Sequence, residues 1–382
     1  MNRPIYLDYN ATTPTDPEVL EAMLPYFKEA FGNASSNSHS YGWEASQAVE
    51  TARKQVSELI EAKPKNIVWT SGATESNNLA LFSIIRPYLK RGEPVHLITT
   101  LIEHKAVLDV ARELESEGCL VTYLKPDQFG QISAESVAQA ITPHTKLVSI
   151  IMGQNEIGTL NPIKEIGQFT KSKNILFHVD AAQALGKTLI SVDEMNIDLL
   201  SASGHKIYAP KGIGFLYVRD QIQLEPMLFG GAQECGLRPG TLNVPGIVAF
   251  GKACEICTQN MSTEILRLTK LRDQFIEKVE SAVSSAKLNG HRTARLYSNA
   301  SFSFEGLSAD VFALGLSGLA VSSGSACSQG APSHVLEAIG LPPALARATV
   351  RFGIGRFTTE AELDTAASKI IKMIEKNKAL SI

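Results

Sequence analysis

The chain has few cysteines, no strong excess of charge and no long apolar run. Its five cysteines are odd in number and widely scattered, which argues against a disulfide framework and for reduced thiols. The formal net charge is -3 and no long run of either sign occurs, which argues against a broad basic surface for nucleic-acid binding. No apolar stretch approaches the roughly 20 residues that a membrane span needs. We therefore expect neither direct nucleic-acid binding nor a membrane location.

The amino-terminal stretch MNRPIYLDYNATTP lacks the apolar and small-residue regions of a signal peptide, so we expect a cytoplasmic protein. The C-x-x-C motif formed by Cys254 and Cys257 falls within a predicted helix. A four-ligand zinc site would need a second pair of ligands. We therefore expect packing cysteines there and no metal site.

Seven short apolar runs alternate with longer helical stretches over the first two thirds of the chain. They occupy 67–71, 95–100, 121–124, 147–152, 175–180, 198–203 and 214–218. Several are continuously apolar, as expected for strands covered by helices on both faces. The pattern predicts an α/β fold with a mostly parallel central sheet flanked by helices, in a large domain over residues 15–255.

The pattern changes near residue 256. A charged helix at 263–283 is followed by short strand-like pieces and a closing helix at 359–376. We expect a smaller α/β domain built from residues 1–14 and 256–382. In such a plan, ligands bind at the carboxyl ends of the strands and in the cleft between domains.

Polar residues collect where the predicted strands end. The first run leads into the small-residue turn SGATESNN, which offers backbone N–H groups and the Thr74 hydroxyl to a phosphate, although a plain helix cap looks much the same. Later runs are followed by Glu103, His104, Asn155, Glu156, Asp180 and Gln183. Each of these residues could instead have a purely structural role, either capping a helix or hydrogen-bonding to a nearby group. Their repeated position at converging strand ends favours a common site.

The sixth run, 198–203, leads into the sequence Ser203-Gly204-His205-Lys206. Lysine is rarely buried, and desolvation lowers the pKa of its amine, which suits imine formation. A surface lysine is the alternative, but it leaves Ser203 and His205 unexplained.

Cys327 lies in the stretch AVSSGSACSQGAPSHVLEAIG, which is rich in glycine, serine and alanine and predicts a loop. A lone cysteine is often a small buried hydrophobic residue, but such a loop offers no core. Exposure favours a nucleophilic thiolate.

Many collinear motifs now point to a known family: YLDYNATTP, SGATESNN, EHKAVLD, NEIG, HVDAAQALG, DLLSASGHKIYAPKGIGFLYV, RPGTLNVP and SSGSAC. Nearly end to end, the chain resembles the cysteine desulfurases of the IscS and NifS type, within class V of the fold type I enzymes that use pyridoxal 5'-phosphate (PLP). The resemblance implies the fold type I architecture and PLP as cofactor.

The resemblance also implies roles for individual residues. Lys206 would carry PLP, Asp180 would pair with the ring nitrogen, Gln183 would contact the phenolic oxygen, and His104 would stack on the ring and act as a candidate acid or base. The phosphate would be held by Ala73, Thr74, Ser203 and His205, and by Thr241 reaching in from the other subunit of a homodimer with shared sites. Asn155, beside the cofactor, and Arg351 would hold the substrate carboxylate. Cys327 would accept the sulfur as a persulfide.

The implied reaction converts L-cysteine to L-alanine and passes sulfur to acceptor proteins for iron–sulfur clusters, tRNA or DNA thio-modification, or cofactor synthesis. Alternatives are a class V selenocysteine or cysteine lyase, an aminotransferase, or an idle sulfur-relay scaffold. Two positions depart from the family pattern: Cys235 stands where an arginine is usual, and Ala34 where a proline is usual. Because Cys235 replaces a charged arginine, any ionic contact that the family makes at this position is in doubt.

Overall fold

The computed structural model describes residues 3–306, 316–323 and 333–380. The seven predicted strands form one sheet in the order β2-β8-β7-β6-β5-β3-β4. Their bounds are β2 (Ile67–Thr70), β3 (His96–Thr100), β4 (Leu120–Leu124), β5 (Thr145–Ile151), β6 (Leu176–Asp180), β7 (Leu199–Ser203) and β8 (Gly214–Val218). The expected α/β fold with a mostly parallel sheet is confirmed.

β8 is the exception to the parallel order, because it runs antiparallel to both β7 and β2. The connection from β7 to β8 covers residues 204–213 and contains only the short 3₁₀ helix η2 (Gly204–Lys206). A parallel crossover needs about a dozen residues or more, usually with a helix. The chain therefore turns back beside β7.

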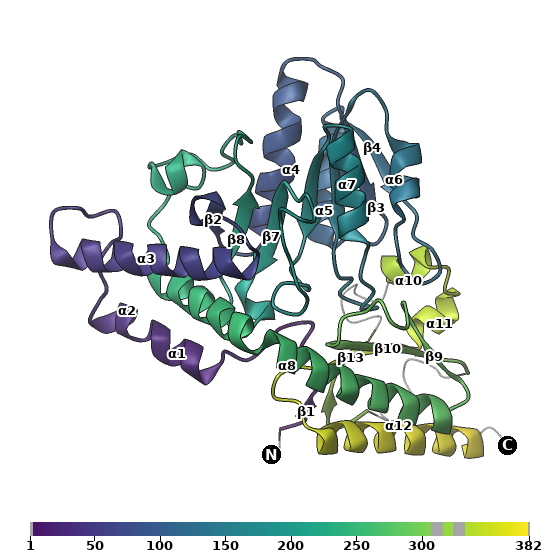
Figure 1. Ribbon diagram of the computed structural model, residues 1–382. Helices are drawn as coiled ribbons and strands as arrows, with labels where there is room; N and C mark the ends of the chain where they lie inside the picture. The colour runs from purple at the N-terminus through teal and green to yellow at the C-terminus, as the bar shows by residue number, and fades with distance from the viewer. Residues whose placement is uncertain (1–2, 307–315, 324–332, 381–382) are drawn as a thin grey trace.

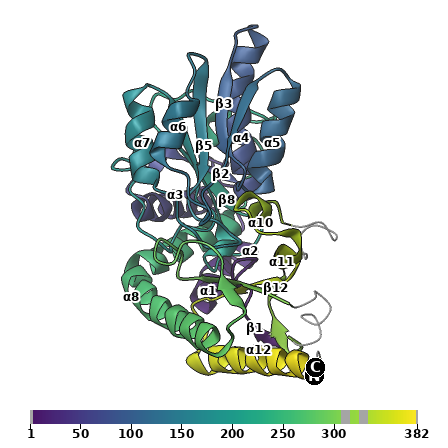
Figure 2. The same cartoon turned by 90° about the vertical axis from the view of Figure 1, so that its right-hand side faces the viewer.

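Helices cover both faces of the sheet. Figure 2 shows α6 (Ala134–Ala140) and α7 (Ile163–Ser172) on one side, and α4 (Ala73–Lys90) and α5 (Lys105–Ser116) on the other. Two separate clusters of buried apolar side chains lie on these two faces. The α5 sequence shows why: its buried apolar residues recur every three or four positions and form one apolar stripe, namely Val107, Val110, Ala111 and Leu114.

The smaller part contains a four-stranded antiparallel sheet in the order β12-β13-β10-β9. These strands are β9 (Ala286–Leu288), β10 (Asn299–Phe304), β12 (Ser322–Ser323) and β13 (Thr349–Gly353). The amino-terminal strand β1 (Ile5–Tyr6) pairs in parallel with β11 (Leu319–Ala320). The start of the chain thus joins its carboxyl-terminal part, which explains how residues near position 10 reach a site built elsewhere.

The remaining helices complete both parts. They are α1 (Pro17–Met23), α2 (Pro25–Lys28), α3 (Ser40–Leu59), α8 (Val244–Ala282), α10 (His334–Ala338), α11 (Pro343–Arg347) and α12 (Glu360–Leu380), with 3₁₀ turns η1 (Pro64–Asn66) and η3 (Gln233–Gly236). In Figure 1, α8 extends from beneath α3 to lie above α12. Its first half packs in the core of the large sheet and its second half in that of the small sheet.

Because α8 is continuous, the proposed domain boundary at residue 255 falls inside a helix, and the division itself stays a prediction. Cys254 and Cys257 are buried in the first half of α8 and carry no disulfide. Within the described residues, no helix is both long and apolar enough to cross a membrane.

Candidate active site

A cavity of ≈680 Å³ lies at the carboxyl ends of the large sheet's strands. Its walls come from the residues that follow β2, β3, β5, β6 and β7, from the amino-terminal residues and from the small sheet. Ten residues predicted from the sequence line it together: Ala73, Thr74, His104, Asn155, Asp180, Gln183, Ser203, His205, Lys206 and Arg351. Both parts of the fold therefore build one site.

The amino terminus of α4 provides an anion-binding end to this cavity. Among the described residues, no side chain caps the helix, so its first backbone N–H groups are available to a ligand. Gly72, just before it, has a φ of 156°, and a Cβ on Gly214 would lie 2.5 Å from the Gly72 Cα atom. A side chain at position 214 would therefore clash with the Gly72 backbone, and the positive φ of Gly72 favours glycine at position 72 as well. Burial lowers the pKa of His205 to about 4, so its neutral ring can donate an N–H to an anion at pH 7.

Asp180 is held on both of its carboxylate oxygens. Its side chain lies at the end of β6 and the residue is only 2% exposed. Oδ2 accepts a hydrogen bond from Asn77 Nδ2 at 2.7 Å, and Oδ1 accepts one from the Ala182 N–H at 2.9 Å. Asn77 comes from α4, so the helix that offers the anion site also orients the carboxylate.

The Gln183 amide is oriented by three hydrogen bonds. Its Oε1 accepts from Asn10 Nδ2 at 3.2 Å and from Lys187 Nζ at 3.3 Å, while its Nε2 donates to the Asn10 carbonyl at 2.8 Å. The amide oxygen is therefore occupied, and Nε2 keeps a second N–H for a ligand.

Lys206 lies in the 3₁₀ turn that follows β7 and is half-buried. Its Nζ donates to the carbonyl oxygens of Asn10 and Ala11, each at 2.8 Å. The amino-terminal segment thus passes beside the lysine. The sequence motif YLDYNATTP signalled that this segment matters, but assigned none of its residues to the site.

His104 caps α5: its Nδ1 accepts a hydrogen bond from the Ala106 N–H at 3.1 Å. The proton of the neutral ring therefore sits on Nε2, which is the atom left to exchange protons with a ligand. The neighbouring Glu103 is fully buried, and burial raises the pKa of its carboxyl group to about 8.

Arg351 reaches the cavity from β13. Its Nη1 donates to the Asn155 carbonyl at 3.0 Å and its Nη2 to Asp8 Oδ1 at 2.8 Å. Asn155 and Arg351, predicted to act on the same carboxylate, are thus joined directly. Asp8 also lines the cavity and was not predicted as a site residue.

Two further site residues were predicted from the sequence, Thr241 and Cys327. Thr241 is exposed and does not line the cavity of its own subunit. Cys327 lies outside the described residues. Beside Cys235, which is exposed, Glu234 makes a bidentate ion pair with Arg53 at 2.8 and 3.0 Å, so an ionic contact exists next to the departure from the family pattern.

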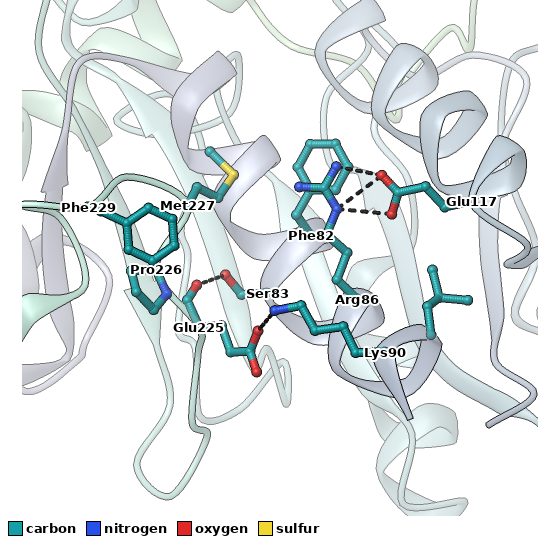
Figure 3. Close-up of a pocket in the computed structure, with 10 residues that line it drawn as sticks. Phe82, Ser83, Arg86, Lys90, Glu117, Glu225, Pro226, Met227 and Phe229 are labelled. Carbon is teal, nitrogen blue, oxygen red and sulfur yellow. Dashed lines mark hydrogen bonds and ion pairs between the residues drawn. The ribbon is translucent and has the colours of Figure 1, made fainter. Parts of the chain in front are cut away.

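A second pocket of ≈400 Å³ lies between α4 and residues 225–229 and contains none of the predicted site residues. Figure 3 shows its charged groups already paired, Arg86 with Glu117 and Lys90 with Glu225. Nothing in its lining points to a reaction.

The residues that line the ≈680 Å³ cavity fit PLP. A helix terminus with hydroxyls suits the phosphate, a buried carboxylate suits a protonated ring nitrogen, and an amine on Lys206 suits the aldehyde. The amide of Gln183 has an N–H to spare for a phenolic oxygen. These four features lie in one cavity.

Known proteins share both the sequence and the fold. Cysteine desulfurase IscS of Rickettsia rickettsii (strain Iowa) is 49% identical over 382 residues, covering 99% of this chain and 93% of that protein. A solved NifS-like protein is 34% identical with a TM-score of 0.91, covering 97% of this chain and 99% of that one. The solved structure of SspA in complex with cysteine is 41% identical with a TM-score of 0.82, covering 93% and 100%.

The family profile for Aminotransferase class-V matches residues 5–365, which is nearly the whole chain. This family implies PLP as cofactor, in keeping with the donor set of the cavity. The chain therefore belongs to the class-V aminotransferase family.

Proposed function

We propose that the ≈680 Å³ cavity binds PLP and L-cysteine and passes the substrate sulfur to Cys327. The protein is a cysteine desulfurase, as its full-length relatives are. The observation that carries the residue assignment is the meeting of Lys206, Asp180 and Arg351 in one cavity. A lysine for the cofactor, a carboxylate for its ring and an arginine for an amino acid are the parts this reaction needs.

The cofactor would be held by residues of the large sheet. Lys206 would carry it, the α4 terminus with Ala73, Thr74, Ser203 and His205 would bind its phosphate, Gln183 would donate to its phenolic oxygen, and His104 would stack on its ring. Asp180 would keep the ring nitrogen protonated, since an ion pair favours the charged form. When bound, PLP supplies an electron sink for the electron pair left at the substrate Cα.

Arg351 and Asn155 would bind the substrate carboxylate and so fix the direction of the Cα–H bond. Arginine suits this task because its planar guanidinium can donate two parallel hydrogen bonds. His104 would give or take a proton at Nε2, because its Nδ1 is occupied by the α5 backbone.

Cys327 would attack the substrate sulfur as a thiolate. The Cβ–S bond of cysteine breaks, an S–S bond forms on Cys327, and Cβ takes up a proton, so L-cysteine and one thiol give L-alanine and one persulfide. Atoms and electrons balance without an added oxidant. The persulfide would then pass to an acceptor protein, for iron–sulfur clusters, tRNA or DNA thio-modification, or cofactor synthesis.

The active unit would be a homodimer in which Thr241 completes the partner's phosphate site. The exposure of Thr241 and its absence from the lining of its own cavity support this. A cytoplasmic location stays a prediction.

The test of the cofactor assignment is Lys206→Ala. PLP linked to a lysine amine absorbs visible light, so the wild-type protein should be yellow, whereas the variant should lose this band and its alanine production. Lys211→Ala is the matched control, because Lys211 also lines the cavity and has no proposed role. A band that survives in Lys206→Ala and disappears in Lys211→Ala would refute the assignment.

A further inference from the structure

Asp8 forms an ion pair with Arg351 inside the cavity. The distance from Asp8 Oδ1 to Arg351 Nη2 is 2.8 Å, and the side chains are 21% and 9% exposed. The Asp8 backbone is fixed as well, because it forms a parallel bridge with Gly353, two residues beyond Arg351. The pair is therefore built into the joint between the amino-terminal segment and β13.

The hydrogen-bond count of Arg351 leaves room for a carboxylate. A guanidinium has five N–H groups. Asp8 takes one from Nη2 and the Asn155 carbonyl takes one from Nη1. Each terminal nitrogen keeps a second N–H, which together are enough for a bidentate contact. The buried Nε has no hydrogen-bond partner among the described residues. The hydrogen bonds of Nη1 and Nη2 are therefore the ones that orient the Arg351 side chain.

We propose that Asp8 is a positioning residue that holds the Arg351 guanidinium ready for the substrate carboxylate. The inference rests on the proposed function, in which Arg351 binds that carboxylate. Asp8 fixes a long, flexible side chain before substrate arrives and balances its charge while the site is empty. Without Asp8, the Arg351 side chain would lose its conformational freedom only when substrate binds, and this loss of entropy would weaken substrate binding.

The test compares Asp8→Ala with Asp8→Asn. Alanine removes the acceptor, so the KM for L-cysteine should rise roughly tenfold or more, while kcat at saturation changes little, because the loss of a charge-assisted hydrogen bond acts on binding. Asparagine keeps an acceptor oxygen at the same place and should restore most of the affinity, with a KM within about threefold of wild type.

A binding measurement separates positioning from general damage. L-alanine, which has a carboxylate, and L-alaninamide, which has none, should be titrated into the PLP-loaded proteins by calorimetry. Asp8→Ala should weaken L-alanine binding and leave L-alaninamide binding unchanged. Equal weakening of both ligands would overturn the proposal.

Asp16→Ala is the matched control. Asp16 pairs with Arg356 at 2.7 Å and so ties the same amino-terminal segment to the same stretch of chain, but it does not line the cavity. Its loss should lower the melting temperature without changing the KM. An equal rise in KM for Asp16→Ala would show that Asp8 acts only by docking the amino-terminal segment, and this would overturn the specific role.

The proposed function and the inference fail differently. A wild-type protein that makes no alanine from L-cysteine contradicts the function. A normal KM in Asp8→Ala together with a raised KM in Arg351→Ala contradicts only the role of Asp8. A normal KM in Arg351→Ala contradicts the carboxylate assignment on which that role rests.

Discussion

Lys187 carries an amine in the interior, next to the site, where it donates to Gln183. Burial lowers the pKa of this amine to about 7, and the nearby charge of Lys206 adds to the effect. The side chain therefore loses its proton in the folded protein at a pH where the unfolded chain still holds it. Stability should depend on pH for this reason.

The sign follows from proton binding. Between about pH 7 and 10.5, the ordinary pKa of a lysine amine, the unfolded chain binds the extra proton, so the stability contributed by Lys187 rises with pH. The melting temperature of wild type relative to Lys187→Met should therefore increase from pH 6.5 to pH 9.5. Lys125→Met, at an exposed position, should leave that slope unchanged. A difference between wild type and Lys187→Met that stays flat or falls over this range would show that the amine is not desolvated.

The same neighbourhood shows which site residues a sequence can reveal. Asp180 and Lys206 were predicted because charged side chains stand out at the ends of apolar strands. Asn10 was not, because it meets Lys206 through a backbone carbonyl, which every residue has. Asp8 was missed because its partner Arg351 lies 343 positions away, and no local pattern joins them.

At the level of elements, the buried strands were predicted well because they are continuously apolar. The run at 214–218 coincides with β8, and the run at 198–203 differs from β7 by one residue. The direction of β8 was not predictable from its apolar residues, since parallel and antiparallel strands can both be buried. It follows instead from the short connection over residues 204–213.

The short strands of the smaller part were harder to predict. β1, β11 and β12 have two residues each, too few to show an alternating pattern. Their position depends on pairing with distant segments, such as Ile5 with Leu319. The sequence also did not show that α8 is one continuous helix. Its two halves bury residues in different cores, so the composition of the helix changes midway.

At the level of the whole molecule, the described structure leaves large apolar side chains exposed near the amino terminus. Leu24, Phe27, Phe31 and Trp43 are 50%, 59%, 64% and 59% exposed. Such a group favours contact with another chain. In the homodimer proposed above, a second copy would cover such a surface, and Thr241 would reach the partner's cavity.

The shared site can be tested by mixing subunits. In a dimer of one Lys206→Ala chain and one Thr241→Ala chain, one cavity carries both changes and the other carries neither. Mixing the two proteins under conditions of subunit exchange should therefore give one intact site per mixed dimer and raise alanine production above that of the two separate variants. Exchange is checked by differently tagged chains. No recovery in verified mixed dimers would mean that each cavity is complete within one chain.

The central claim is that sulfur from L-cysteine is transferred to Cys327. The most direct measurement is peptide mass spectrometry of the protein during turnover, with Cys327→Ser as the paired variant. In wild type, the Cys327 peptide should gain one sulfur atom, while the peptides of Cys119, Cys235, Cys254 and Cys257 should not. Cys327→Ser should keep the visible band of PLP and make almost no alanine, because a hydroxyl is a poor nucleophile toward sulfur. Alanine production by Cys327→Ser at close to the wild-type rate, or added sulfur found only on the other cysteines, would contradict the claim.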